Sequence, residues 1–172
     1  MSVTERYANF PVWVSSNTEE AQELFSDLCC DRSTTVHDIR FMIDAGINPR
    51  YNNDQAFRAS CGRNINVFKY FIEEYGVDIN FKEISPIKNA MTSGNPEFFR
   101  ILLEKSIDIP DCAIEWMIEW KCHNEINMML EYGQDPTRVA RALWCILQKK
   151  CNGIDNIMDI LNKYGIDLNT VR

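Results

Sequence analysis

The 172-residue sequence contains few of the side chains that usually carry catalysis or hold a metal ion. Histidine occurs only twice, as His37 and His123, and we expect both to be ordinary surface or loop residues. The seven cysteines never show the Cys-x₂₋₄-Cys or His spacing of a zinc site. A glycine-rich phosphate-binding loop is also missing. We therefore predict no catalytic, cofactor-binding or metal-binding residues.

Long apolar runs are missing as well. No run approaches the ~20 residues that a membrane-spanning helix requires. The N-terminal segment MSVTERYANFPVWVSS lacks the basic and apolar regions of a secretory signal. The odd number of cysteines, mostly within helical patterns, is typical of reduced, buried thiols. These features predict a cytoplasmic or nuclear protein without a membrane partner.

Basic charge is sparse. The chain has 18 Lys and Arg residues against 25 Asp and Glu residues, a net charge of −7, and no basic cluster exceeds the pair Lys149-Lys150. Binding to nucleic acid normally requires a basic face that displaces counterions, so we predict none. An acidic surface opposes self-association and attracts a basic partner. We expect a monomer or a weak homo-oligomer.

A turn that recurs along most of the chain is the clearest positive feature. Counting from Gly46 to Gly76, Ser106, Gly133 and Gly165 gives steps of 30, 30, 27 and 32 residues. A regular period of this length indicates a repeat architecture, in which neighbouring units supply the core that one unit cannot form alone. Glycine suits this turn because the residue after a helix often adopts a left-handed conformation.

Apolar residues at helical spacing precede these turns, as in Val67–Ile72 and Ile154–Leu161. A hydrophobic content of 45% and a charged content of 25% exclude a disordered chain. The length fits one domain, residues 1–172, with a substantial core. We predict an all-α fold.

The segment Ser85–Leu103, SPIKNAMTSGNPEFFRILL, resembles the core of the ankyrin repeat, TPLHxAAxxGHxxxVxxLL. The matching positions are Ser85, Pro86, Ile87, Ala90, Gly94, Phe98, Phe99, Ile101, Leu102 and Leu103. The family's closing turn, GADVN, follows in eroded form at Ser106–Pro110. The resemblance implies a solenoid of about five stacked helix pairs, with repeats at residues 18–50, 51–80, 81–110, 111–136 and 137–172. Residues 51–80 are similar to the degenerate ankyrin repeats of large DNA viruses and some intracellular bacteria.

Three regions depart from the ankyrin pattern. The histidine of TPLH is missing throughout, so the hydrogen bond that it makes across repeats must be replaced or lost. The loop Lys121–Asn124 contains no glycine, so we expect its turn to deviate from the family. Residues 1–17 fit no repeat and are expected to be an extended N-terminal cap; the alternative is a recognition segment around Trp13.

The resemblance also implies a protein-binding surface, the concave face made of turn tips and the exposed sides of the first helices. The family's variable positions correspond here to Arg50, Tyr51, Asn53, Cys61, Phe81, Lys82, Ile84, Thr92, Glu119 and Trp120. Tyr51, Phe81 and Trp120 would form an aromatic row, the residue type that most often carries binding energy. In the alternative interpretation Phe81 packs on a neighbouring repeat and Trp120 is buried.

Three functions follow as hypotheses. The resemblance implies a non-catalytic protein–protein interaction module, one version of which is an antagonist of a host factor. A protein that binds or sequesters a small molecule or nucleotide in a concave pocket is the first alternative. An enzyme, or an enzyme accessory, whose site the sequence does not reveal is the second.

Overall fold

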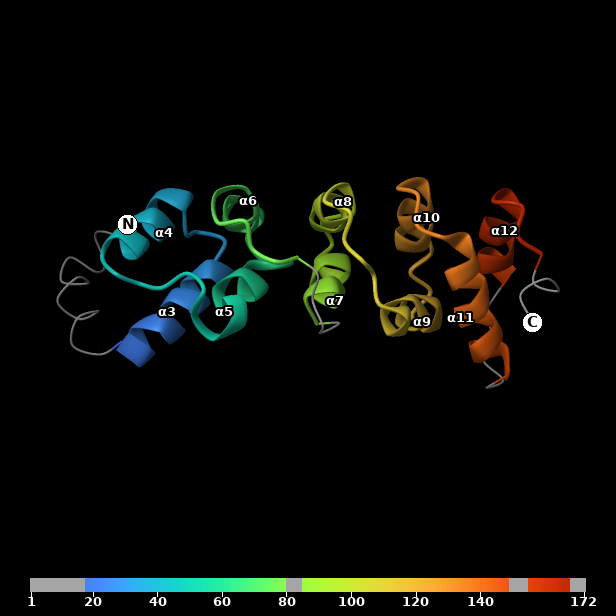
Figure 1. The fold of residues 1–172 in the computed structure, drawn as a ribbon, viewed down its shortest axis with the longest axis horizontal. Coiled ribbons are helices and arrows are strands. Elements are labelled where there is room, and N and C mark those ends of the chain that lie inside the picture. The colour runs from blue at the N-terminus through green and yellow to red at the C-terminus, as the bar shows by residue number, and fades with distance from the viewer. Residues whose placement is uncertain (1–17, 80–84, 149–154, 168–172) are drawn as a thin grey trace. The chain divides into compact units, whose positions relative to one another are not determined.

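The computed structural model describes residues 18–79, 85–148 and 155–167, and the predicted N-terminal cap lies outside these ranges. Every regular element within them is an α-helix, so the prediction of an all-α fold is confirmed (Figure 1). The helices are α3 (Thr18–Cys30), α4 (Val36–Asp44), α5 (Tyr51–Ser60), α6 (Ile65–Glu74), α7 (Ser85–Thr92), α8 (Glu97–Glu104), α9 (Asp111–Glu119), α10 (His123–Glu131), α11 (Pro136–Gln148) and α12 (Asp155–Lys163).

The chain divides into two compact units. Unit 1 comprises Met1–Ile79 and Ser85–Phe98, and unit 2 comprises Asn80–Ile84 and Phe99–Arg172. The division falls within α8, after its second residue. The expectation of a single domain over residues 1–172 stays a prediction.

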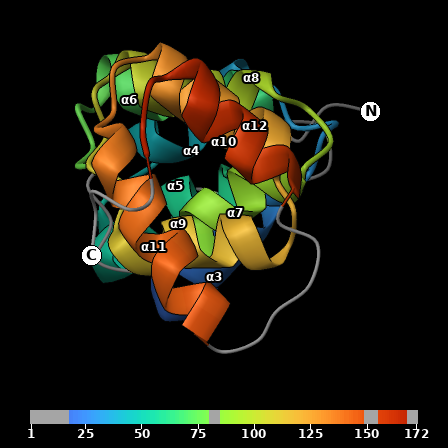
Figure 2. The same ribbon diagram turned by 90° about the vertical axis from the view of Figure 1, so that its right-hand side faces the viewer.

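Unit 1 contains helix pairs in which the first helices pack together and the second helices pack together. Helix α3 packs against α5 and α4 packs against α6, while α3 also contacts α4 and α5 contacts α6. Both views place α4 and α6 in one layer and α3 and α5 in the other (Figures 1 and 2). Phenylalanine rings fill the space between the layers: Phe57 stacks on Phe68 with ring centroids 5.2 Å apart, and the ring of Phe25 meets that of Phe71 edge-on at 6.3 Å.

Unit 2 repeats this packing scheme with a different core. Helix α9 packs against α11 and α10 packs against α12, while α9 also contacts α10 and α11 contacts α12. Its core is mainly aliphatic and sulfur-containing, and fully or nearly fully buried members include Ile107, Ile109, Ile114, Met117, Ile126, Met129, Leu143, Ile146, Ile157 and Leu161. Both units are therefore helical-repeat-like in their local packing.

The recurring turn has the conformation that the sequence predicts. Its five residues, Gly46, Gly76, Ser106, Gly133 and Gly165, all have positive φ. At four of the five, all except Gly76, two further hydrogen bonds close the helix end. The turn residue donates its N–H to the carbonyl three residues earlier, and the next residue donates to the carbonyl five residues earlier. This is the Schellman arrangement, which satisfies carbonyls that the helix end leaves unpaired.

Asn64 makes hydrogen bonds between neighbouring helix pairs of unit 1. Its side-chain Oδ1 caps α6 by accepting from the Val67 N–H at 3.3 Å. Its Nδ2 donates to the carbonyls of Asp31 and Thr34, at 2.7 and 2.9 Å, in the loop that joins α3 to α4. Asn64 thus links the start of α6 to the loop between α3 and α4.

Candidate protein-binding surface

The residues predicted around the start of α5 are largely held by contacts within unit 1. Arg50 forms an ion pair with Asp54 and donates a hydrogen bond to the Tyr75 carbonyl at 3.2 Å. Tyr51 is half-buried, whereas Asn53 is exposed. Asn53 also has a positive φ of 55°, a conformation that asparagine tolerates better than most residues. Of these three predicted residues, Arg50 and Asn53 are exposed, and Arg50 is held by its ion pair and hydrogen bond.

The other residues predicted in the binding surface include one that is buried, one that is exposed and three that the structure does not describe. Cys61 was predicted to face a partner, and this is wrong: its side chain is completely buried and its Sγ donates to the Pro86 carbonyl at 3.1 Å. It is buried because the chain after α5 passes close to α7. Thr92 is exposed, at the end of α7. Phe81, Lys82 and Ile84 lie outside the described residues. Because Tyr51 and Trp120 belong to different units, the aromatic row stays a prediction.

In unit 2, α9 has one buried and one open face. Ala113, Ile114, Met117 and Ile118 are buried. The other side of the helix carries Cys112, Glu115, Trp116, Glu119 and Trp120, all exposed or half-buried, with Trp120 at the C-cap. We call these five residues the α9 face. The predicted Glu119 and Trp120 are part of it.

Two tryptophans dominate the α9 face. Trp120 has 68% of its surface exposed, so the alternative that this residue is buried is wrong. Its indole stacks on that of Trp116, with ring centroids 5.7 Å apart and an interplanar angle of 28°. The spacing i, i+4 places the two rings one helical turn apart, and the stack holds both in a defined orientation. The exposed indole of Trp120 is therefore held by the stack at the end of α9.

Acidic side chains run beside the tryptophans. Asp111, Glu115 and Glu119 are also spaced by four residues and therefore form a second row on the helix. Arg138 of α11 engages the first of them, donating to Asp111 Oδ1 at 2.7 Å and pairing with Asp108 Oδ1 at 3.3 Å. These hydrogen bonds and charges raise the pKa of Arg138 against the opposing effect of its partial burial. Asp111 is thus paired within unit 2, where it shares Arg138 with Asp108.

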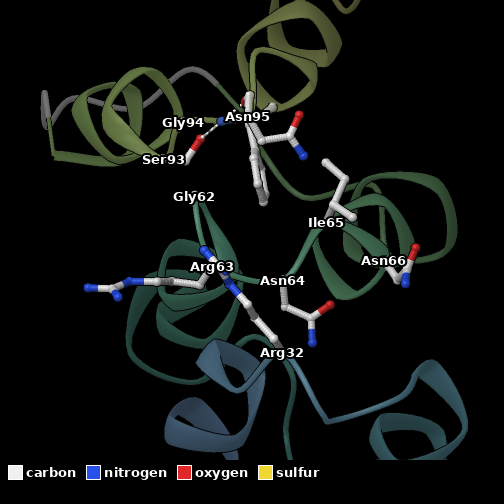
Figure 3. Close-up of a pocket in the computed structure, with 10 residues that line it drawn as sticks. Arg32, Gly62, Arg63, Asn64, Ile65, Asn66, Ser93, Gly94 and Asn95 are labelled. Atoms are coloured by element: carbon white, nitrogen blue, oxygen red, sulfur yellow. Dashed lines mark hydrogen bonds between the residues drawn. The ribbon is translucent and has the colours of Figure 1, made fainter.

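Unit 1 contains a separate cavity of about 380 Å³, drawn in Figure 3. The cavity is lined by the loops between paired helices and by the first residues of α6 and α8. The lining residues are Arg32, Gly62, Arg63, Asn64, Ile65, Asn66, Ser93, Gly94, Asn95 and Phe98. Arg32 reaches from the loop after α3 toward the break after α5. Ser93 is already committed, because its Oγ donates to the Ala90 carbonyl and accepts from the Asn95 N–H. The cavity is therefore polar, and it lies at the helix breaks.

The thiols differ between the two units. Burial raises the pKa of Cys29, and it raises that of Cys61 to about 12. Because the thiolate is the nucleophile, a raised pKa lowers the reactive fraction near neutral pH. The expectation of buried thiols is confirmed for Cys29 and Cys61 and is wrong for Cys112 and Cys145 of unit 2, which are exposed.

Neither histidine lies in a cluster that could bind metal. Among the described residues, no group of three or more His, Cys, Asp and Glu side chains is placed to hold a metal ion. His37 is exposed on α4, and His123 is the first residue of α10. None of the helices described here combines the length and the apolar character needed to cross a membrane.

Glu115 and Trp116 were not singled out by the sequence reasoning, although a signal for them was present. The apolar residues Ala113, Ile114, Met117 and Ile118 define one side of a helix, and the spacing then assigns Glu115 and Trp116 to the opposite side. The variable positions of the ankyrin family correspond to residues at the end of this helix, so they did not predict Glu115 and Trp116 in its middle.

No protein-family model, no curated protein and no solved structure matches the chain. The likeness to ankyrin repeats therefore depends on the residues quoted above and on the local geometry of the turns and helix pairs.

Proposed function

We propose that the chain is an ankyrin-like repeat protein whose function is the non-catalytic binding of a partner protein, with the α9 face as the contact surface. The observation that carries the proposal is Trp120, which keeps 68% of its surface exposed while stacked on Trp116. A tryptophan contributes a large area to an interface, and exposed aromatic residues are the commonest binding hot spots. Blocking or recruiting the partner would need no chemistry beyond this contact; blocking a host factor remains one version of that function.

The repeat architecture is supported by local features of each unit. Helices pack first with first and second with second, and four of the five turns share the same hydrogen bonds. In repeat proteins the faces that stacking leaves open are the usual binding surfaces. The buried side of α9 contributes to the core of unit 2, which leaves its open side for a partner.

Capture of partners by the full chain tests the proposal. Proteins retained from the lysate of its natural cell are quantified for the wild type, Trp120→Ala and Tyr132→Ala. Tyr132 is a matched control because it is another exposed aromatic residue of unit 2, at the end of α10. A hot-spot tryptophan is expected to lower the affinity of its partner by about 30-fold, or ~2 kcal/mol, when truncated. If every retained protein binds Trp120→Ala as well as the wild type, the α9 face is not the contact surface.

A second candidate function is the binding of a small anion, and the cavity beside Arg32 favours it. The guanidinium of Arg32 forms no ion pair with any described residue, and the N-terminus of α6 lies in the cavity wall. Both features attract negative charge. A thermal-shift screen with nucleotides and inorganic phosphate tests it: a rise in melting temperature that Arg32→Gln abolishes would support it, and no shift would exclude these ligands.

A further inference from the structure

The open side of α9 combines two rows of different chemistry. One row is Cys112, Trp116 and Trp120, and the other is Asp111, Glu115 and Glu119. Adjacent rows on a helix place ring faces and carboxylates side by side. The helix Asp111–Glu119 contains no lysine or arginine. The surface therefore offers negative charge near the exposed indole of Trp120.

The two carboxylates of the α9 face are uncommitted. Arg138 occupies Asp111, but Glu115 and Glu119 form no ion pair with any residue that the structure describes. Two basic residues of unit 2 are relevant: Lys121 follows the helix directly, and Arg141 lies on α11, where its charge acts on Asp135. Neither forms an ion pair with Glu115 or Glu119 in the described part of the chain.

Elsewhere in the protein, an aromatic ring and a nearby carboxylate are joined by a cationic side chain. In unit 1, the Arg40 guanidinium lies 5.1 Å from the centre of the Tyr70 ring and pairs with Glu74 at 3.1 Å. In unit 2, the Lys163 ammonium lies 5.4 Å from the centre of the Tyr164 ring and 3.7 Å from a Glu131 oxygen. Each site contains an aromatic ring, a carboxylate and a cation. On the α9 face, Trp120 supplies a ring and Glu115 and Glu119 supply carboxylates, but among the described residues no cation lies over the Trp120 ring or pairs with either glutamate.

We propose that the occupant of the α9 face is a protein segment that presents lysine or arginine side chains, which stack on Trp120 and pair with Glu115 and Glu119. This inference rests on the proposed function and specifies the chemistry of the partner. Tryptophan is the best aromatic acceptor of a cation, and arginine can stack on the ring while pairing with a carboxylate. An acidic segment would be repelled by the two glutamates, and a purely apolar one would bury them without partners. The net charge of −7 also steers a cationic segment toward the chain.

A phage library of random dodecapeptides is the probe that tests the inference. The library is selected on the immobilised full chain, and each enriched peptide is then measured against Trp120→Ala. We expect the peptides that depend on Trp120 to be enriched in lysine and arginine. Replacing the arginines of one such peptide by citrulline, which is neutral and of nearly the same shape, is expected to weaken binding at least about tenfold.

The double variant Glu115→Gln/Glu119→Gln is expected to weaken the arginine peptide at least about fivefold and to leave its citrulline form unchanged. A matched control is Glu23→Gln/Glu73→Gln, which removes two exposed carboxylates from unit 1 and gives the same net charge. If this control weakens binding equally, the effect is one of overall charge and the assigned pairing is overturned.

Failure of the inference and failure of the proposed function give different results. Peptides that depend on Trp120 but are neutral, apolar or acidic would overturn the cationic partner and leave a protein-binding α9 face. A selection that yields no Trp120-dependent peptide would overturn both the cationic partner and the α9 face. Unchanged melting temperatures of the variants confirm that each measurement is made on folded protein.

Discussion

Unit 1 buries a cluster of phenylalanine rings, whereas unit 2 leaves a tryptophan exposed at the end of α9. In unit 1, Phe25, Phe57, Phe68 and Phe71 are at most 1% exposed and contact one another as a cluster. In unit 2 the core is mainly aliphatic, and the tryptophan at the end of α9 remains open to solvent. The fully buried thiols Cys29 and Cys61 belong to unit 1 and the exposed thiols Cys112 and Cys145 to unit 2, while each unit also has one half-buried thiol, Cys30 or Cys122.

Buried and exposed aromatic rings contribute differently to folding stability and to partner binding. A ring in a tightly packed cluster contributes through apolar area removed from water and through contacts that a smaller residue cannot replace. A ring that remains exposed contributes little to folding and can contribute the same apolar area when a partner covers it. We infer that unit 1 uses its aromatic residues to fold and that unit 2 keeps Trp120 for binding.

The largest expected effect comes from exchanging an aromatic residue for alanine in each unit. Phe57→Ala is expected to lower the free energy of unfolding by about 4 kcal/mol, because it leaves a cavity between Phe68 and Phe71. Trp120→Ala is expected to change it by less than about 1 kcal/mol, because only the exposed stack with Trp116 is lost. Urea unfolding followed by circular dichroism measures both. Equal losses would contradict the assignment of Trp120 to binding.

A smaller effect is expected at the helix break of unit 1. Gly62 has a φ of +77°, and a Cβ there would lie 2.2 Å from the carbonyl oxygen of Asn89. Gly62→Ala is therefore expected to cost about 3 kcal/mol, part from the left-handed backbone and part from the clash. Gly94→Ala is the matched control, with a φ of +74° and no atom within 4 Å, and should cost about 1 kcal/mol. Thermal unfolding distinguishes them, and equal shifts would mean that the chain near Asn89 moves away without cost.

The smallest effect concerns the corresponding break in unit 2, where Lys121 adopts a φ of +57° without being glycine. Lys121→Gly is expected to stabilise the chain by about 0.5 kcal/mol, because the relief of backbone strain exceeds the extra entropy of glycine in the unfolded state. Lys121→Ala removes the charge but retains the Cβ, so it should give no gain. A stabilisation by alanine equal to that by glycine would identify charge as the cause.

The break at Lys121 also illustrates what could be predicted from the sequence. The missing glycine suggested that this turn deviates from the others, yet its residue takes the same sign of φ as Gly62 and Gly94. The turn is preserved because Lys121 donates to the Ile118 carbonyl and Cys122 to the Met117 carbonyl, which close the end of α9. Contacts of the helix end override the local preference of lysine.

The burial of Cys61 could not be predicted from the sequence. Its position in the family pattern predicted an exposed residue, but burial depends on the segment that packs over it, here the start of α7 at Pro86. The spacing of apolar residues along α6 predicted a buried side, and Val67 and Phe71 confirm it. The α9 face was not predicted in this way. Which side chains of the open face would stack or pair could not be predicted, because this depends on rotamers and on Arg138 from the next helix pair.

The sequence by itself determined the helices, the recurring left-handed turn and the sides of the helices that are buried. These are local properties, since the turns depend on backbone sterics at one residue and the buried sides depend on the 3.6-residue helical period. Only the tertiary structure decided that Cys61 is covered, that Arg138 pairs with Asp111, and that Trp120 is left stacked and open. These outcomes depend on residues distant in sequence, whose positions are fixed by how neighbouring helix pairs pack.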